Sequence, residues 1–226
     1  MIPLYFYILL GSISIPLFFT IFIKDFIKDW KQFFLSTITI AIIFLVWDFY
    51  FTKIGVWSFN YNYCLGIKIF EMPVEEWLFF LIIPFCSLFI HFCAITVNPK
   101  FRFKKKTTIS LTAFFIILSI ILVLLNPSKK YTAVNFSVLT IVLLLGFLFF
   151  KPILQQFYAT FIIILVPFFI VNGILTGSFL ETPIVNYNNF ENLGIRVFTV
   201  PIEDIGYCFS MLFGNLMIYE TLQKKK

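Results

Sequence analysis

The chain is poor in charge. Only 12% of its 226 residues are Asp, Glu, Lys or Arg, whereas 61% are hydrophobic and 34 are Phe. Typical soluble domains carry about 25% charged residues, so an ordinary soluble domain is excluded. The apolar residues form runs close to the roughly 20 residues that a helix needs to cross a bilayer. We therefore expect an all-α membrane protein.

The residues that several chemistries require are also missing. There is a single His, His91, and the four Cys show no C-x-x-C spacing, so we expect no metal site and interpret the thiols as buried and inert. No Gly-rich phosphate loop is present, and no predicted span contains the Lys that a retinal Schiff base needs. The net charge of +6 comes from Lys and Arg in loops and in the tail, so we expect no nucleic acid partner.

The apolar runs predict about seven transmembrane helices. They cover residues 2–23, 33–51, 75–97, 108–125, 131–150, 153–175 and 202–220. Five of the 17 Lys and Arg lie at the N-terminus and in the loops after the second, fourth and sixth spans, and twelve lie in the other loops and the tail. The positive-inside rule then predicts an N-terminus outside and a C-terminus in the cytoplasm.

One stretch of the chain occurs twice. Residues 65–76 (LGIKIFEMPVEE) and 193–204 (LGIRVFTVPIED) lie 128 positions apart, with six of twelve positions identical and five conservatively replaced. We infer a first repeat over residues 1–97, a basic loop and connecting span over 98–130, and a second repeat with a basic tail over 131–226. Three spans plus one connector make an even number, so the repeats run parallel and present both acidic motifs at one depth, near the outer leaflet.

The charged groups within the membrane domain are the candidate catalytic residues, because burying charge there is costly. They are Glu75 and Glu76, Glu203 and Asp204, and Asp48 near the outer end of the second span. Neighbouring helix residues point about 100° apart, so only one acid of each pair can face a shared cavity. Acids after a proline are also favourable in any first helical turn, and the motifs could be no more than helix starts.

Clustered carboxylates in an apolar pocket can divide into an acid and a base. A reaction that needs both, and no metal or nucleophile, is protonation of an alkene to a carbocation, which aromatic faces and a carboxylate stabilise. The residues that we expect to line such a site and bind its substrate are Trp57, Trp77, Phe79, Phe80, Asn172 and Tyr207.

These motifs resemble those of the integral-membrane lycopene cyclases. Residues 73–80 (PVEEWLFF) are similar to that family's Pro-x-Glu-Glu followed by aromatic residues. Residues 201–207 (PIEDIGY) are similar to its Pro-x-Glu-Asp-x-x-Tyr, and residues 172–177 (NGILTG) resemble the end of its penultimate span. The resemblance covers nearly the whole chain, in the order of the two repeats.

The resemblance implies an intramolecular lyase or isomerase of the bacterial inner membrane that converts the linear end groups of lycopene to β-rings, yielding β-carotene. It implies Glu75 and Glu203 as the central acid–base pair, with Glu76 and Asp204 in support and Asp48 as a further candidate. The expected partners are the lipophilic carotenoid, membrane lipid and other enzymes of the carotenoid pathway. We expect no flavin, because the chain lacks a Gly-rich dinucleotide fingerprint.

Two other functions fit parts of this pattern. A small transporter can also be built from parallel three-helix repeats, although its substrate site belongs near the membrane midplane and not at the helix entrances. A non-catalytic carotenoid- or lipid-binding protein would keep the aromatic cavity and tolerate loss of the carboxylates. Ring type, ring number, the assignment of acid and base, and oligomeric state are left open by the sequence.

Overall fold

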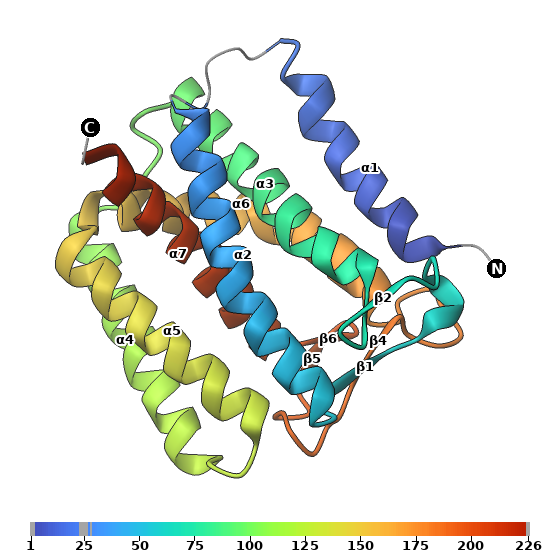
Figure 1. The fold of residues 1–226 in the computed structure, drawn as a ribbon. Coiled ribbons are helices and arrows are strands. Elements are labelled where there is room, and N and C mark those ends of the chain that lie inside the picture. The colour runs from blue at the N-terminus through green and yellow to red at the C-terminus, as the bar shows by residue number, and fades with distance from the viewer. Residues whose placement is uncertain (1–2, 23–26, 28, 225–226) are drawn as a thin grey trace.

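The described part of the chain, residues 3–22, 27 and 29–224 of a computed structural model, is a bundle of seven helices with short strands gathered at one end (Figure 1). The helices are α1 (Leu4–Phe19), α2 (Trp30–Lys53), α3 (Val74–Val97), α4 (Lys105–Leu125), α5 (Lys130–Phe149), α6 (Lys151–Leu175) and α7 (Glu203–Lys224). Each expected span has its helix, which confirms the helical class. The ends of the span predicted at 2–23, parts of the following basic loop and the last two Lys lie outside the described residues.

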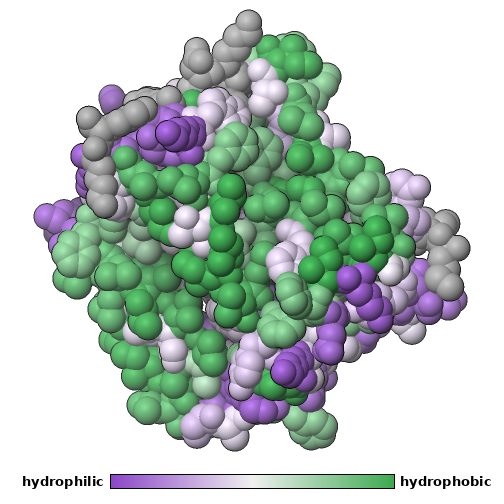
Figure 2. All heavy atoms as spheres, in the orientation of Figure 1, coloured by the Kyte–Doolittle hydropathy of each residue, from purple (hydrophilic) through white to green (hydrophobic). Residues whose placement is uncertain are grey.

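Five helices, α2 to α6, are long and apolar enough to cross a membrane. Helix α1 is apolar but has 16 residues, which is about 24 Å of helix against a hydrocarbon core of about 30 Å. Figure 2 shows hydrophobic surface over most of the face in view, with hydrophilic residues collected towards two opposite ends. The chain is therefore a membrane protein.

Helix α7 differs from the predicted seventh apolar span because it is the centre of the bundle. Every residue from Cys208 to Met217 is buried. Its Asn215 accepts a hydrogen bond from Ser36 (2.7 Å) and donates one to Thr37 (3.0 Å), both on α2. Because the middle of α7 is covered by protein, it can carry polar residues that find partners inside the bundle.

The helices of the two halves interlock. Helix α1 packs on α3, and α5 packs on α7 in the same way. The second helix of each half lies against the third helix of the other half, α2 against α7 and α6 against α3. A cavity that lies where the two halves meet is therefore lined by residues of both halves.

The strands repeat the same geometry at the 128-residue offset. The sheets are β1 (Trp57–Phe59) with β4 (Val185–Tyr187), β2 (Lys68–Ile69) with β3 (Met72–Pro73), and β5 (Arg196–Val197) with β6 (Val200–Pro201). Lys68 pairs with Pro73 in one hairpin, and Arg196 pairs with Pro201 in the other. Strands β1 and β4 are themselves 128 residues apart and pair antiparallel with each other. Pairing of a strand with its own counterpart is what a two-fold axis between the halves would produce.

Candidate active site

Each acidic pair lies in the first turn of a helix that leaves a hairpin. Pro73 precedes α3 in extended conformation, and Glu75 and Glu76 follow in the first turn. Helix α7 begins with Glu203 and Asp204 after the second hairpin. Both hairpins close the same backbone contact, from Val74 N to Ile67 O (2.9 Å) in the first and from Ile202 N to Ile195 O (3.0 Å) in the second. The repeated motif therefore presents its acids in the same way twice.

The first acid of each pair turns back to its own loop. Glu75 Oε1 accepts from Leu65 N at 2.6 Å, and Glu203 Oε1 accepts from Leu193 N at 2.7 Å. Both side chains are fully buried. Glu203 also accepts from Thr132 (2.7 Å) on α5. These two glutamates join the loop before the hairpin to the helix after it, and they do not line the central cavity.

The second acid of each pair faces the space between the halves. Glu76 Oε2 accepts from the phenol of Tyr5 at 2.6 Å. Asp204 accepts from two phenols, Tyr131 through Oδ1 and Tyr187 through Oδ2, the latter at 3.0 Å. The 100° step between helix neighbours separates the two acids of a pair, as expected, but the inward member is the second one in each case. The sequence-based ranking of Glu75 and Glu203 as central therefore differs from the arrangement in the structure.

Asp48 completes the group of inward-facing carboxyls. It comes from α2, is 3% exposed, and interacts electrostatically with Glu76. Its Oδ2 has no hydrogen-bond partner among the described residues, nor does the hydroxyl of Tyr207. Unpaired polar atoms in a buried cavity are available to hydrogen-bond a ligand.

The cavity is small, about 60 Å³, and both halves contribute to it. It is lined by Tyr5, Asp48, Trp57, Phe59, Glu76, Phe79, Phe80, Ile83, Tyr131, Phe168, Asn172, Leu175, Thr176, Val185, Tyr187, Asp204, Tyr207, Cys208 and Met211. Ligand pockets typically span roughly 300–1,000 Å³, so this one must widen to take an organic substrate.

Most of the residues predicted from the sequence meet in this cavity. Those that line it are Asp48, Glu76, Asp204, Trp57, Phe79, Phe80, Asn172 and Tyr207. Trp77 does not; its indole donates to Ile69 O (3.2 Å) and its ring lies 6.1 Å from that of Phe70, on the hairpin. Trp77 follows Glu76 by one residue, so the same helical step turns it away from the cavity.

Aromatic rings surround the carboxyls. The ring of Tyr207 lies 4.8 Å from Trp47 and 4.9 Å from Phe44. On the other side, Tyr131 lies 5.3 Å from Trp57 and 5.7 Å from Tyr187. Aromatic faces carry partial negative charge, so this surround favours a cation in the cavity.

Sequence reasoning missed three tyrosines that bind the inward acids: Tyr5, Tyr131 and Tyr187. Tyr5 and Tyr131 hold equivalent places near the start of the first helix of each half, but they are 126 residues apart and not 128. A two-residue shift therefore hid them from a comparison at constant offset. Tyr187 lies on β4, and burial, reinforced by the charge of Asp204, raises its pKa well above the usual range. It stays a hydrogen-bond donor at physiological pH.

The cations near the motifs contact aromatic rings and backbone. Lys68 Nζ lies 3.8 Å from the ring centre of Tyr61. Arg196 donates to Thr199 O (2.6 Å) and stacks at 5.8 Å from the ring of Tyr187. Within the described residues the one ion pair is Lys130–Glu191, so neither repeated cation neutralises an acid of the site directly.

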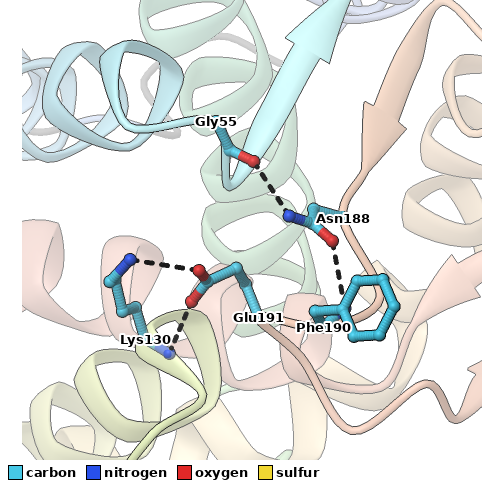
Figure 3. Close-up of polar contacts among 5 residues, drawn as sticks. All are labelled: Gly55, Lys130, Asn188, Phe190 and Glu191. Atoms are coloured by element: carbon cyan, nitrogen blue, oxygen red, sulfur yellow. Dashed lines mark hydrogen bonds and ion pairs between the residues drawn. The ribbon is translucent and has the colours of Figure 1, made fainter.

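That ion pair holds the loop after β4 to the start of α5 (Figure 3). Glu191 accepts from both the backbone N and Nζ of Lys130, each at 3.1 Å. Asn188 reaches across to Gly55 O (3.3 Å) at the end of α2. Tyr131 follows directly on α5, and its N donates to Glu191 O (2.9 Å). The loop thus places Tyr131 beside Asp204.

No group of three or more potential metal ligands occurs among the residues that the structure describes. His91 lies inside the bundle and hydrogen-bonds Thr160 at 2.8 Å, so it has a packed and hydrogen-bonded position. Outside the membrane helices, burial, and then the charge of Glu75, raises the pKa of Cys64 to about 12, so this thiol is protonated and inert at neutral pH.

The fold and the cavity define the class of protein: a helical membrane bundle in which three inward-facing carboxyls, phenol donors and aromatic rings meet. The family model described as lycopene cyclase matches residues 3–94 and 128–222, most of the chain. The chain belongs to the lycopene cyclase family. The two matched segments coincide with the two halves of the fold. Comparison with curated proteins and with solved structures finds no match. Membership implies an enzyme that cyclises a carotenoid.

Proposed function

We propose that the protein is a lycopene cyclase that converts linear end groups to β-rings by acid–base catalysis, without a cofactor. One observation carries this assignment: Asp48, Glu76 and Asp204 come from three helices of both halves and line one aromatic cavity. A structural role as helix starts would explain the position of Glu76 and Asp204 along their helices. It would not explain why each is turned inward onto a tyrosine.

Hydrogen bonding separates the roles of the carboxyls. Asp204 accepts two phenol hydrogen bonds, and donors to the charged form of an acid favour that form. We assign Asp204 as the carboxylate that stabilises the cation and removes the final proton. Asp48 and Glu76 are neighbouring carboxyls in one buried space, where like charges oppose simultaneous ionisation. We assign this pair as the proton donor.

The reaction is redox-neutral and balances within the substrate. The donor transfers a proton to the terminal double bond of the end group, which leaves a tertiary cation. The inner double bond attacks this carbon, the six-membered ring closes, and the positive charge moves onto the ring. Asp204 takes a proton from the adjacent ring carbon that was part of the inner double bond, and the new double bond defines a β-ring. Loss of the proton on the other side would yield an ε-ring.

The placement in the membrane belongs to the same proposal. Seven helices in two parallel repeats cross the bacterial inner membrane, with the N-terminus outside and the C-terminus in the cytoplasm. The loop distribution of Lys and Arg supports this orientation. The carboxylate cavity then lies towards the outer leaflet, at the end of the bundle that carries the strands. At mid-depth, Asn215 of α7 is hydrogen-bonded to α2 and lines neither hollow, which argues against a transporter site there.

The test is expression in a bacterium that accumulates lycopene, with pigment chromatography and mass detection. Wild-type protein should yield a ringed product of unchanged mass with the retention of β-carotene. Glu76→Gln and Asp204→Asn should abolish the product at equal membrane expression, whereas Glu71→Gln, at the exposed hairpin tip, should not. Lycopene bound but unconverted by the wild type would replace the proposal with the binding function, and conversion that survives both substitutions would refute the assigned roles.

A further inference from the structure

A second hollow lies on the same bundle, away from the carboxyls. It has a volume of about 360 Å³ and lies between α2, α5 and α7. We call it the tail groove; its lining is Ile40, Val142, Leu145, Phe150, Gly214, Met217, Ile218, Thr221 and Leu222. Eight of these nine residues are apolar, and Leu145 is 40% exposed. The groove is therefore open to the apolar surroundings of the bundle.

The tail groove continues the helix faces that line the carboxylate cavity. On α7, Tyr207 lines the cavity, and Gly214 and Ile218, seven and eleven residues further, line the groove. On α5, Tyr131 and Val142 are separated by the same eleven residues. At 3.6 residues per turn, these spacings return to one side of a helix. The two hollows thus lie along one track.

A thin apolar layer separates the two hollows along that track. On α2, Phe44 lies between Asp48 in the cavity and Ile40 in the groove, and on α7 Met211, which closes the cavity on that side, lies between Tyr207 and Gly214. Phe44 and Met211 are 3% and 2% exposed. An unbranched Met side chain adapts its shape readily, so this layer can yield to a long apolar chain.

The two halves differ at this point. Helices α1 and α6 contact each other, whereas their counterparts α5 and α2 flank the open groove. At the groove floor, a Cβ on Gly214 would lie 3.1 Å from Ile40 Cδ1, so the glycine lets α7 and α2 approach closely there. An asymmetric molecule built from similar halves therefore offers one long apolar track and one carboxylate cavity.

We propose that the tail groove holds the polyene of the carotenoid whose end group occupies the carboxylate cavity. This inference rests on the proposed cyclase function. Even when widened to take an end group, a cavity of about 60 Å³ is far too small for a whole carotenoid, so the remaining chain must lie elsewhere on apolar surface. Asp204 and Gly214 are ten residues apart, about 15 Å along α7, which a long polyene spans. With one track, each binding event presents one end group, and the one-ring product must leave and turn before the second ring forms.

The test compares two substrates and two matched variants in membranes. Leu145→Trp fills the groove, and Leu144→Trp adds the same bulk at an adjacent residue that does not line it and is 42% exposed. The substrates are lycopene and an apocarotenoid with one linear end group and a chain too short to reach Gly214. Leu145→Trp should lower kcat/KM for lycopene roughly tenfold, mainly through KM, and leave the short substrate within about twofold of wild type. Leu144→Trp should change neither.

Each of the other possible results of this experiment would refute a specific claim. Normal turnover of lycopene by Leu145→Trp would overturn the inference and assign the groove to a lipid chain. Equal losses on both substrates would also overturn it if a second groove variant, Ile218→Phe, behaves in the same way. A wild-type protein that cyclises neither substrate would refute the proposed function itself, which separates that failure from a failure of the groove.

Discussion

The most direct test of the proposed base, Asp204, is to remove the tyrosine hydroxyl that donates a hydrogen bond to it. Tyr131 is 1% exposed and its hydroxyl donates to Asp204 Oδ1. Tyr131→Phe deletes this hydroxyl and keeps the ring, which continues to pack at 5.3 Å from Trp57. The substitution therefore removes one hydrogen bond from the carboxylate and leaves the aromatic surround in place.

The expected magnitude follows from the charge on the acceptor. A hydrogen bond to an ionised group contributes about 1.5–3 kcal/mol, and each 1.36 kcal/mol is tenfold in rate. Tyr131→Phe should lower kcat roughly 10- to 150-fold. Tyr187→Phe removes a hydrogen bond of 3.0 Å and should lower kcat by a factor near the lower end of this range. Because both phenols act on one carboxylate, the double variant should depart from additivity.

The assay is the initial rate of lycopene conversion in membranes with matched protein content, resolved into kcat and KM. Tyr50→Phe is the control, since Tyr50 is 57% exposed on α2 and makes no described contact with the carboxyls. A change confined to KM would mean that the hydroxyl serves binding. An unchanged kcat in both Tyr131→Phe and Tyr187→Phe would refute the assignment of Asp204 as the ionised partner.

Three further predictions concern residues that surround the cavity without lining it. Glu75→Leu should cost about 1–3 kcal/mol of stability, because it removes the buried acceptor of Leu65 N, while activity per folded molecule is largely kept. Thermal unfolding in detergent and rates on purified protein separate the two effects. Glu191→Gln should lower stability by less than about 1 kcal/mol in the same unfolding assay, because its partner Lys130 is 52% exposed. Burial raises the pKa of Cys64 to about 12, so this thiol should react with maleimide far more slowly at pH 8 in the folded than in the denatured protein. Raising the pH through 9 should favour unfolding, because only the unfolded thiol ionises in that range.

Much of the fold could be predicted because hydrophobicity is a local property. Seven runs predicted seven helices, and the duplicated motif predicted that both halves start their third helix in the same way. Helix α7 differs from the other predicted spans, because Cys208 to Met217 are covered by other helices and it is not among the five helices apolar enough to cross a membrane. Burial by protein and burial by lipid select similar residues, so composition alone separates them poorly.

Many of the predicted site residues lie together in the structure, in an arrangement that differs in detail. Asp48, Glu76, Asp204 and five of the six expected substrate-binding residues line the cavity. The tyrosines that donate hydrogen bonds to Glu76 and Asp204 come from α1, α5 and β4, up to 73 residues away in sequence. No periodicity within one helix carries that information, because it depends on how separate elements pack.

The sequence by itself determined a helical membrane protein, two similar halves and a pair of acids at the start of each third helix, because apolar run length and duplication can be seen along the chain. Only the tertiary structure decided which acid of each pair faces the cavity. Adjacent residues differ by 100° around a helix, and the rotation of α3 and α7 is set by the hairpins before them and by the helices of the opposite half. That rotation anchors Glu75 and Glu203 to their loops and leaves Glu76 and Asp204 facing the cavity with Asp48.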